Sequence, residues 1–402
     1  MSAGPRSRRL GAALLRVAPL GFALFVQTTW LRSVLSHDDP MSVARRDWTI
    51  FWETGRHLVA GELDAIYPRV FDRGYLWLYP PYCIYLTAPL GLLAEPAAYG
   101  VCFGIELVAV GAALALLRAS LPAPRRDHWT AAAVVLASMP FNTTVAMGQI
   151  SGILTLILAL AVHAWVRGRA FAAGLFVALL FLKPQIAAFV ALAAILAREW
   201  RMVAGIVTGC AALAAASLPL GVARWAEYAR TMEEYVAVVR DATPLWKQLT
   251  LYAFWRTVPG LDTNVALGLW LASVTLLIAI AAAAIWRTGP STPDRRARIV
   301  ALAVLLGLAL NVYAYFYDGL LLAVPGIVWY VRRREYRHAD TVAIAACVAA
   351  VFVVGYVRVF LVSSGVSWAG AFIGLWAGVE AYDLLAGSAE RVVARQAVAA
   401  AL

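Results

Sequence analysis

Long apolar stretches separated by short charged connections dominate the chain. A membrane-spanning helix needs about 20 apolar residues, and a dozen stretches bounded by charge or by Pro and Gly are candidates. The first, residues 10–31, follows a basic segment and is too long for the apolar part of a cleaved signal peptide. We therefore expect an all-α polytopic membrane protein of about 11–12 membrane segments, forming one integral membrane domain over residues 1–402.

The charged connections predict a topology. Those at residues 118–128, 167–169, 198–201, 287–298 and 332–340, and the tail after 388, each carry at least two arginines. Short arginine-rich loops stay cytoplasmic by the positive-inside rule. We therefore predict a bacterial inner-membrane protein with a cytoplasmic N-terminus and two long extracytoplasmic loops, residues 32–79 and 221–263.

One apolar stretch does not fit this scheme. Residues 79–93 are short for a span and contain Pro80, Pro81 and Pro89. A full crossing here would also place the arginines of residues 118–126 outside. We predict a re-entrant or juxtamembrane segment packed on protein, which leaves about eleven full crossings.

Composition supports the membrane interpretation. Of the 402 residues, 62% are hydrophobic and 14% are charged, too apolar for a soluble surface. The net charge of +11 lies in clusters between apolar spans, which argues for topology and against nucleic acid as a partner. The four cysteines lie in apolar segments without paired spacing, so we expect neither a disulfide framework nor a metal site.

The first long loop contains a predicted interfacial helix at residues 45–61. Helical periodicity places Trp48, Phe51, Trp52, Gly55, Leu58 and Val59 on one face and Arg46, Glu53, Arg56 and His57 on the other. Asp47 falls at the margin of the apolar face, where partial desolvation would raise its basicity and suit a general base. The plainer alternative is that Asp47 only caps the helix.

Other polar residues lie at the predicted outer ends of the spans. They are Gln149 in the turn after Gly148, Lys183 before Pro184, Asp318 after an aromatic run, and Arg358. Ionisable residues at membrane depth suggest function. Lys183 and Lys247 are the two lysines of the chain. A lysine held by the following proline suits a phosphate, although Lys183 could instead extend toward lipid headgroups. Gln149 could equally be a polar contact between helices.

Several motifs of known chemistry are absent. The sequence has no P-loop, no GxGxxG after a strand, no HExxH and no CxxC, which argues against a nucleotide-driven pump or a zinc protease. A secondary transporter or lipid flippase remains the main alternative, but it should show internal symmetry and a midplane site. A structural membrane subunit is a third possibility.

The order of these elements resembles glycosyltransferase family 87, a GT-C type family of polyprenyl-phosphate-dependent transferases that includes mycobacterial phosphatidylinositol-mannoside mannosyltransferases. The matching residues are Asp47 to Gly61, Tyr67, Tyr79-Pro-Pro, Pro89-Leu90, Gly148-Gln149-Ile-Ser-Gly152, Gly174, Leu182-Lys-Pro-Gln185 and Tyr317-Asp318 leading to Pro325. Asn311-Val-Tyr313 departs from the Ser/Thr-Pro of many relatives.

The resemblance implies a GT-C type helical bundle and a residue-by-residue hypothesis. Asp47 matches the catalytic base of the family. A polyprenyl-phosphate sugar, with mannose first among the candidates, would place its phosphate near Lys183 with help from Arg358. Gln149, Asp318, Tyr79 and Asn142 would contact the substrates, which include a lipid or glycan acceptor. Neither a metal nor another cofactor is required, although Asp318 or Asp39 could support a divalent ion.

Overall fold

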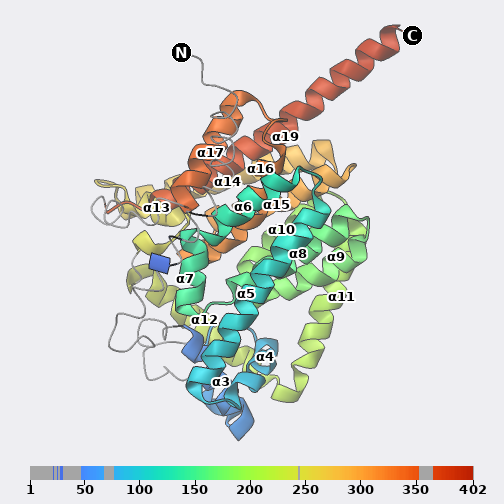
Figure 1. Cartoon of the computed structure of the whole chain (residues 1–402). Helices are drawn as coiled ribbons and strands as arrows, with labels where there is room; N and C mark the ends of the chain where they lie inside the picture. Colours follow the sequence, from blue (N-terminus) through green and yellow to red (C-terminus); the bar gives the residue numbers. More distant parts are fainter. Residues whose placement is uncertain are drawn as a thin grey trace.

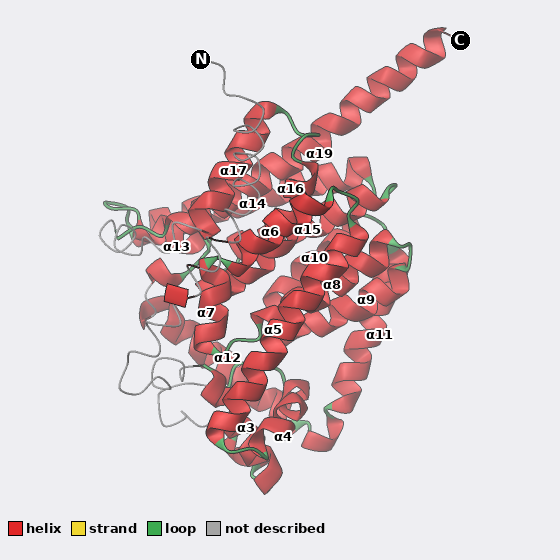
Figure 2. Cartoon of the chain, in the orientation of Figure 1, coloured by secondary structure: helices red, strands yellow, loops and turns green. Residues whose placement is uncertain are grey.

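The protein is all-helical throughout the described part of the chain (Figure 2). The computed structural model describes residues 47–67, 77–242, 245–352 and 365–401, with single residues at 21, 25, 28 and 29. The all-α prediction is confirmed. The expected first transmembrane helix, residues 10–31, lies outside the described residues except for residues 21, 25, 28 and 29.

A short helix in the first long loop packs on another that follows the loop. α3 (Trp48–Ala60) ends at Gly61, whose φ of 77° is a conformation that glycine adopts without strain. η1 (Leu63–Ala65), η2 (Pro81–Cys83) and α4 (Ile84–Gly91) follow. α4 has 8 residues, about 12 Å of helix, and cannot cross a bilayer. This length supports the prediction of a non-spanning segment at residues 79–93, which stays a prediction.

The backbones of α3 and α4 cross so closely that the two glycines at the crossing have no room for a side chain. A Cβ on Gly55 would lie 2.2 Å from the carbonyl oxygen of Thr87, and one on Gly91 would lie 2.1 Å from the backbone of Gly55. The predicted apolar face of α3 is right for Trp48, Phe51 and Gly55, which are buried, but wrong for Val59, which is 50% exposed. Val59 lies in the last turn, beyond this crossing.

Three described helices are long and apolar enough to cross a membrane: α5 (Glu95–Ser120), α11 (Trp200–Ala216) with η4 (Leu218–Leu220), and α14 (Thr263–Thr288). α6 (Arg125–Leu136) and α7 (Met139–Met147) pass the same test together but bend by 49°. Shorter apolar helices are α8 (Ser151–Val166), α9 (Ala170–Leu179) with η3 (Leu180–Leu182), α10 (Pro184–Leu196) and α17 (His338–Phe352). The count of about eleven crossings stays a prediction.

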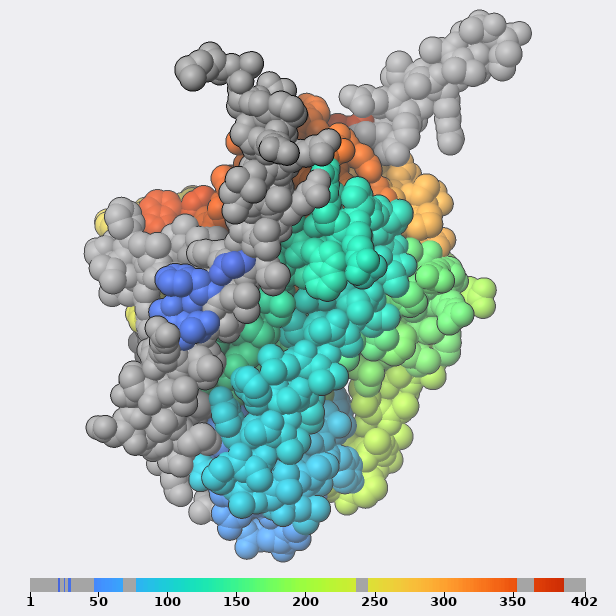
Figure 3. Space-filling model, in the orientation of Figure 1, coloured from blue at the N-terminus to red at the C-terminus, as the bar shows by residue number. Residues whose placement is uncertain are grey.

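One helix of the bundle is buried among its neighbours (Figure 1). In α15 (Pro293–Ala309) every residue from Ala297 to Ala309 is buried, and α8, α10, α16 (Ala323–Arg332) and α19 (Trp368–Ala401) pack against it. α5 instead exposes large apolar side chains, Val108 among them, and Figure 3 shows α5 on the surface of the molecule. This division is typical of a bundle whose outer helices are solvated by lipid.

The second long loop is mostly helical and packs on the first. It comprises α12 (Ala223–Ala242), η5 (Leu245–Lys247) and α13 (Leu251–Thr257). Arg224 donates to the carbonyl oxygen of Leu63 at 2.9 Å and pairs with Asp64. The two long loops, predicted to share one side of the membrane, are therefore in direct contact.

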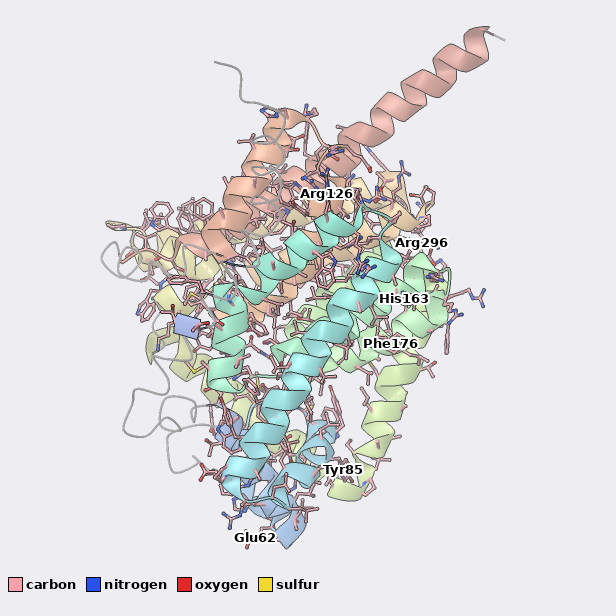
Figure 4. The ribbon with its side chains drawn as sticks, in the orientation of Figure 1. Glu62, Tyr85, Arg126, His163, Phe176 and Arg296 are labelled. Atoms are coloured by element: carbon pink, nitrogen blue, oxygen red, sulfur yellow. The ribbon has the colours of Figure 1, made fainter. Side chains whose placement is uncertain are left out.

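The arginine-bearing connections meet at the opposite end. In Figure 4, Arg126 and Arg296 lie toward one end of the molecule, and Glu62 and Tyr85 lie toward the other. Five of the predicted cytoplasmic connections are linked by Asp127–Arg333, Asp294–Arg332, Arg167 to the Ala119 carbonyl, Arg296 to the Trp165 carbonyl, and Arg198 over the Trp286 ring. They therefore share one end, and its cytoplasmic orientation stays a prediction.

Candidate active site

Asp47 stands immediately before α3 and faces a turn between two other helices. Its backbone N–H donates to the carbonyl oxygen of Met147 at 3.2 Å. Its side chain makes no capping hydrogen bond with α3, so the alternative that Asp47 merely caps this helix is wrong. Instead, Asp47 Oδ2 accepts a hydrogen bond of 2.5 Å from Gln149 Nε2.

The turn that carries Gln149 is shaped by Gly148. This glycine ends α7 with a φ of 64°, and a Cβ there would lie 2.3 Å from Cβ of Trp48. Glycine is therefore required both by the backbone conformation and by the close approach of α3. The turn brings the buried Gln149 amide between two partners, because its Oε1 also accepts from Tyr79 Oη at 3.4 Å.

A buried ion pair forms the second half of the cluster. Lys183, between η3 and α10, pairs through Nζ with Oδ1 of Asp318, and the two residues are 7% and 1% exposed. Asp318 lies in η6 (Phe316–Leu322), where its Oδ2 accepts from the Tyr315 N–H at 3.1 Å. The alternative that Lys183 extends toward lipid headgroups is wrong, because its ammonium is buried against a carboxylate.

The two halves are joined through Tyr317. The Lys183 ammonium lies 4.8 Å from the centre of the Tyr317 ring. The Tyr317 carbonyl oxygen accepts from Thr144 Oγ1 at 3.2 Å, which fixes η6 against α7, the helix that leads into Gly148 and Gln149. Burial raises the pKa of Tyr79 well above its usual value, and the negative charges of Asp318 and Asp47 raise it further. Tyr79 therefore lies within electrostatic reach of both acids.

Most of the predicted site residues converge. Asp47, Gln149 and Tyr79 are hydrogen-bonded, Lys183 and Asp318 are paired, and Asn142 is buried on α7.

Arg358 and Asp39 lie outside the described residues. No group of three or more His, Cys, Asp or Glu residues that could hold a metal occurs within the described part of the chain.

Sequence reasoning missed Glu106, a buried acid in α5. The signal was present, since Glu106 is the one charged residue between Glu95 and Arg118, and an ionisable residue within an apolar span suggests function.

Comparison with known proteins identifies a family and a distant structural similarity. A search of curated proteins gave no match. The crystal structure of ArnT from Cupriavidus metallidurans in the apo state is similar at 14% identity and a TM-score of 0.40, over 94% of this chain and 78% of that one. Similarity at this level does not identify a shared activity.

The family comparison is decisive. The model of glycosyltransferase family 87 matches residues 77–313, more than half of the 402-residue chain. The match includes Tyr79, Asn142, Gln149 and Lys183, whereas Asp47 and Asp318 lie beyond its two ends. The protein is therefore a membrane glycosyltransferase, and the chain belongs to glycosyltransferase family 87.

Proposed function

We propose that the protein transfers a sugar from a polyprenyl-phosphate donor to a hydroxyl of a lipid or glycan acceptor, with inversion at the anomeric carbon. Mannose is the first candidate sugar. The reaction would take place at the extracytoplasmic face of a bacterial inner membrane. The main support for the proposal is the contact of Asp47 with Gln149, two residues 102 positions apart. Tyr317 and its contact with α7 link this pair to Lys183, the only lysine among the buried residues of the described chain.

Asp47 is the proposed general base. A carboxylate accepts at about four lone-pair positions, and Gln149 takes one of them while fixing the plane of the group. Asp47 would remove the proton of the acceptor hydroxyl while its oxygen attacks the anomeric carbon from the face opposite the phosphate. The bond from the anomeric carbon to the phosphate oxygen then breaks, and the electron pair leaves with the phosphate.

Lys183 is the proposed partner of that phosphate. A lysine ammonium has three N–H donors, and its contact with Asp318 Oδ1 uses one. Asp318 and the Tyr317 ring would hold the ammonium in position, while a further N–H would meet the negative charge that grows on the departing phosphate. Arg358 stays a predicted helper, and Tyr79, Gln149 and Asn142 are proposed substrate contacts.

The test compares Asp47→Asn with a matched control. Membranes that contain each variant receive labelled polyprenyl-phosphate-mannose and lipid acceptors, and the labelled product is quantified. We expect Asp47→Asn to lower transfer by about 10²–10⁴-fold, the usual contribution of general acid–base catalysis. Glu62→Gln removes an exposed acid just beyond the same helix, and it should leave transfer unchanged. Equal transfer by Asp47→Asn and the native protein would remove Asp47 from the mechanism.

A further inference from the structure

Glu106 lies inside a helix that is apolar enough to cross a membrane. It is 5% exposed in the middle of α5, where α5 packs along α8. Its Oε2 accepts from the backbone N–H of Gly152 at 2.6 Å. Burying an acid at this depth costs free energy. Its presence here therefore requires a compensating benefit to folding or function.

Stability alone does not explain this acid. Its second oxygen, Oε1, is buried without a hydrogen-bond partner among the described residues, as is the neighbouring Ser151 Oγ. A buried polar atom without a partner costs free energy. An apolar residue at position 106 would therefore make the packing of α5 more stable. The glycine at 152 is also specific, because a Cβ there would lie 2.3 Å from Glu106 Oε2.

The contact is made where α8 begins. The first N–H groups of a helix lack partners within the helix, and a carboxylate at this end is favoured by the helix dipole. Gly152 is the second residue of α8, and Gln149 stands three positions before it. Holding the Gly152 N–H therefore fixes where α8 starts and how the turn from Gly148 to Ile150 leaves it.

We infer that Glu106 is a positioning residue of the transfer site, whose carboxylate holds the N-terminus of α8 and thereby presents Gln149 to Asp47. The inference rests on the proposed role of Asp47. Glu106 does not touch the reacting atoms. It acts through a chain of two hydrogen bonds and one short turn, from Glu106 to Gly152 and from Gln149 to Asp47.

The first experiment follows the turn directly and does not depend on sugar transfer. Hydrogen exchange of residues 147–153 is measured by mass spectrometry for the full chain in nanodiscs. Glu106→Ala should raise exchange there by about tenfold or more, as expected when a buried hydrogen bond is lost. Glu106→Gln keeps an acceptor for the Gly152 N–H and should raise it less. Unchanged exchange in Glu106→Ala would overturn the inference.

A second variant approaches the same contact from the other side and covers the case in which Glu106→Ala does not fold. Gly152→Ala keeps the acid but displaces it, and should loosen residues 147–153 as well. Gly111→Ala is the matched control, because this position on α5 has no atom within 4 Å of an added Cβ. Equal exchange in Gly152→Ala and Gly111→Ala would contradict the assignment.

Transfer kinetics separate positioning from a purely structural role. A misplacement of about 1 Å can cost about 100-fold in rate, so Glu106→Ala should lower kcat by about 10–100-fold while the donor KM changes much less. In a Gln149→Ala background the same substitution should add little, because both act through one contact. Fully additive losses would overturn the positioning role. Absence of transfer by the native protein would instead contradict the proposed function, and the exchange experiment would still decide the role of Glu106.

Discussion

Buried acids are held by different partners at the two ends of the molecule. At the arginine-rich end, Asp127 pairs with Arg333, Asp340 with Arg337, and Glu380 with Arg298. In the half that carries Asp47, the buried acids among the described residues are Asp318, which pairs with Lys183, and Glu106 in the middle of α5, where one oxygen accepts from a backbone N–H. Guanidinium groups bind carboxylates through a rigid planar fork, whereas an ammonium is a compact charge with donors to spare. The first arrangement suits fixed helix contacts, and the second suits a ligand that must come and go.

The largest expected effect tests the structural end. Arg298 contacts Glu380 at 2.7 Å and Asp383 at 2.9 Å, and Arg298→Met leaves both acids without this partner. We expect a loss of about 3–5 kcal/mol in the free energy of unfolding, read as a lower thermal midpoint in detergent. Transfer per folded molecule should be unchanged, because the contacts of Arg298 are far from Asp47. A normal thermal midpoint together with a lower kcat would mean that Arg298 acts in transfer and not in holding the helices together.

A smaller effect is expected at the other end when both members of the ion pair are replaced. Lys183→Met alone would leave Asp318 charged and buried, so the double variant Lys183→Met with Asp318→Asn is the cleaner probe. It should keep most of its thermal stability, while the donor KM rises about 10–100-fold because the phosphate loses its cation. Donor KM equal to that of the native protein would remove Lys183 from donor binding.

The smallest effect is expected at an exposed pair of the arginine-rich end. Glu335 is 64% exposed and meets Arg332 at 2.8 Å. Glu335→Gln should change the free energy of unfolding by less than about 0.5 kcal/mol, since exposed pairs contribute little, and should not change transfer. A loss as large as that of Arg298→Met would mean that the ion pairs of the arginine-rich end act as one unit.

Sequence patterns predicted local structure better than they predicted contacts between residues far apart in the chain. The periodicity around Phe51 and Gly55 gave the first-loop helix to within three residues at its start, and the prolines from Pro80 to Pro89 predicted a segment that does not span. The pairing of Lys183 with Asp318 joins residues 135 positions apart, and no local rule links them. The bend between α6 and α7 was also missed, although Ser138 accepts from the Phe141 N–H in the manner of a helix N-cap.

The sequence predicted which residues of the candidate site lie on one side, but not the hydrogen bonds and ion pairs that join them. Topology alone placed Asp47, Gln149, Lys183 and Asp318 on one side, because each lies at the same end of an apolar stretch. Hydrogen bonds depend on the rotation of each helix about its axis, which hydropathy does not specify. Glu106 was missed because it lies in the middle of α5, whereas the prediction considered polar residues at the ends of spans.

The position of Arg298 has a consequence for how the chain is made. Its partners, Glu380 and Asp383, follow 82 and 85 residues later, and a ribosome needs about 4–17 s to add that length at about 5–20 residues per second. During this interval α15 has been made, while α19, which packs against it, does not yet exist. The arginine-rich end is therefore completed only with the last helix, and a prematurely terminated chain leaves the Arg298 guanidinium without these two carboxylates.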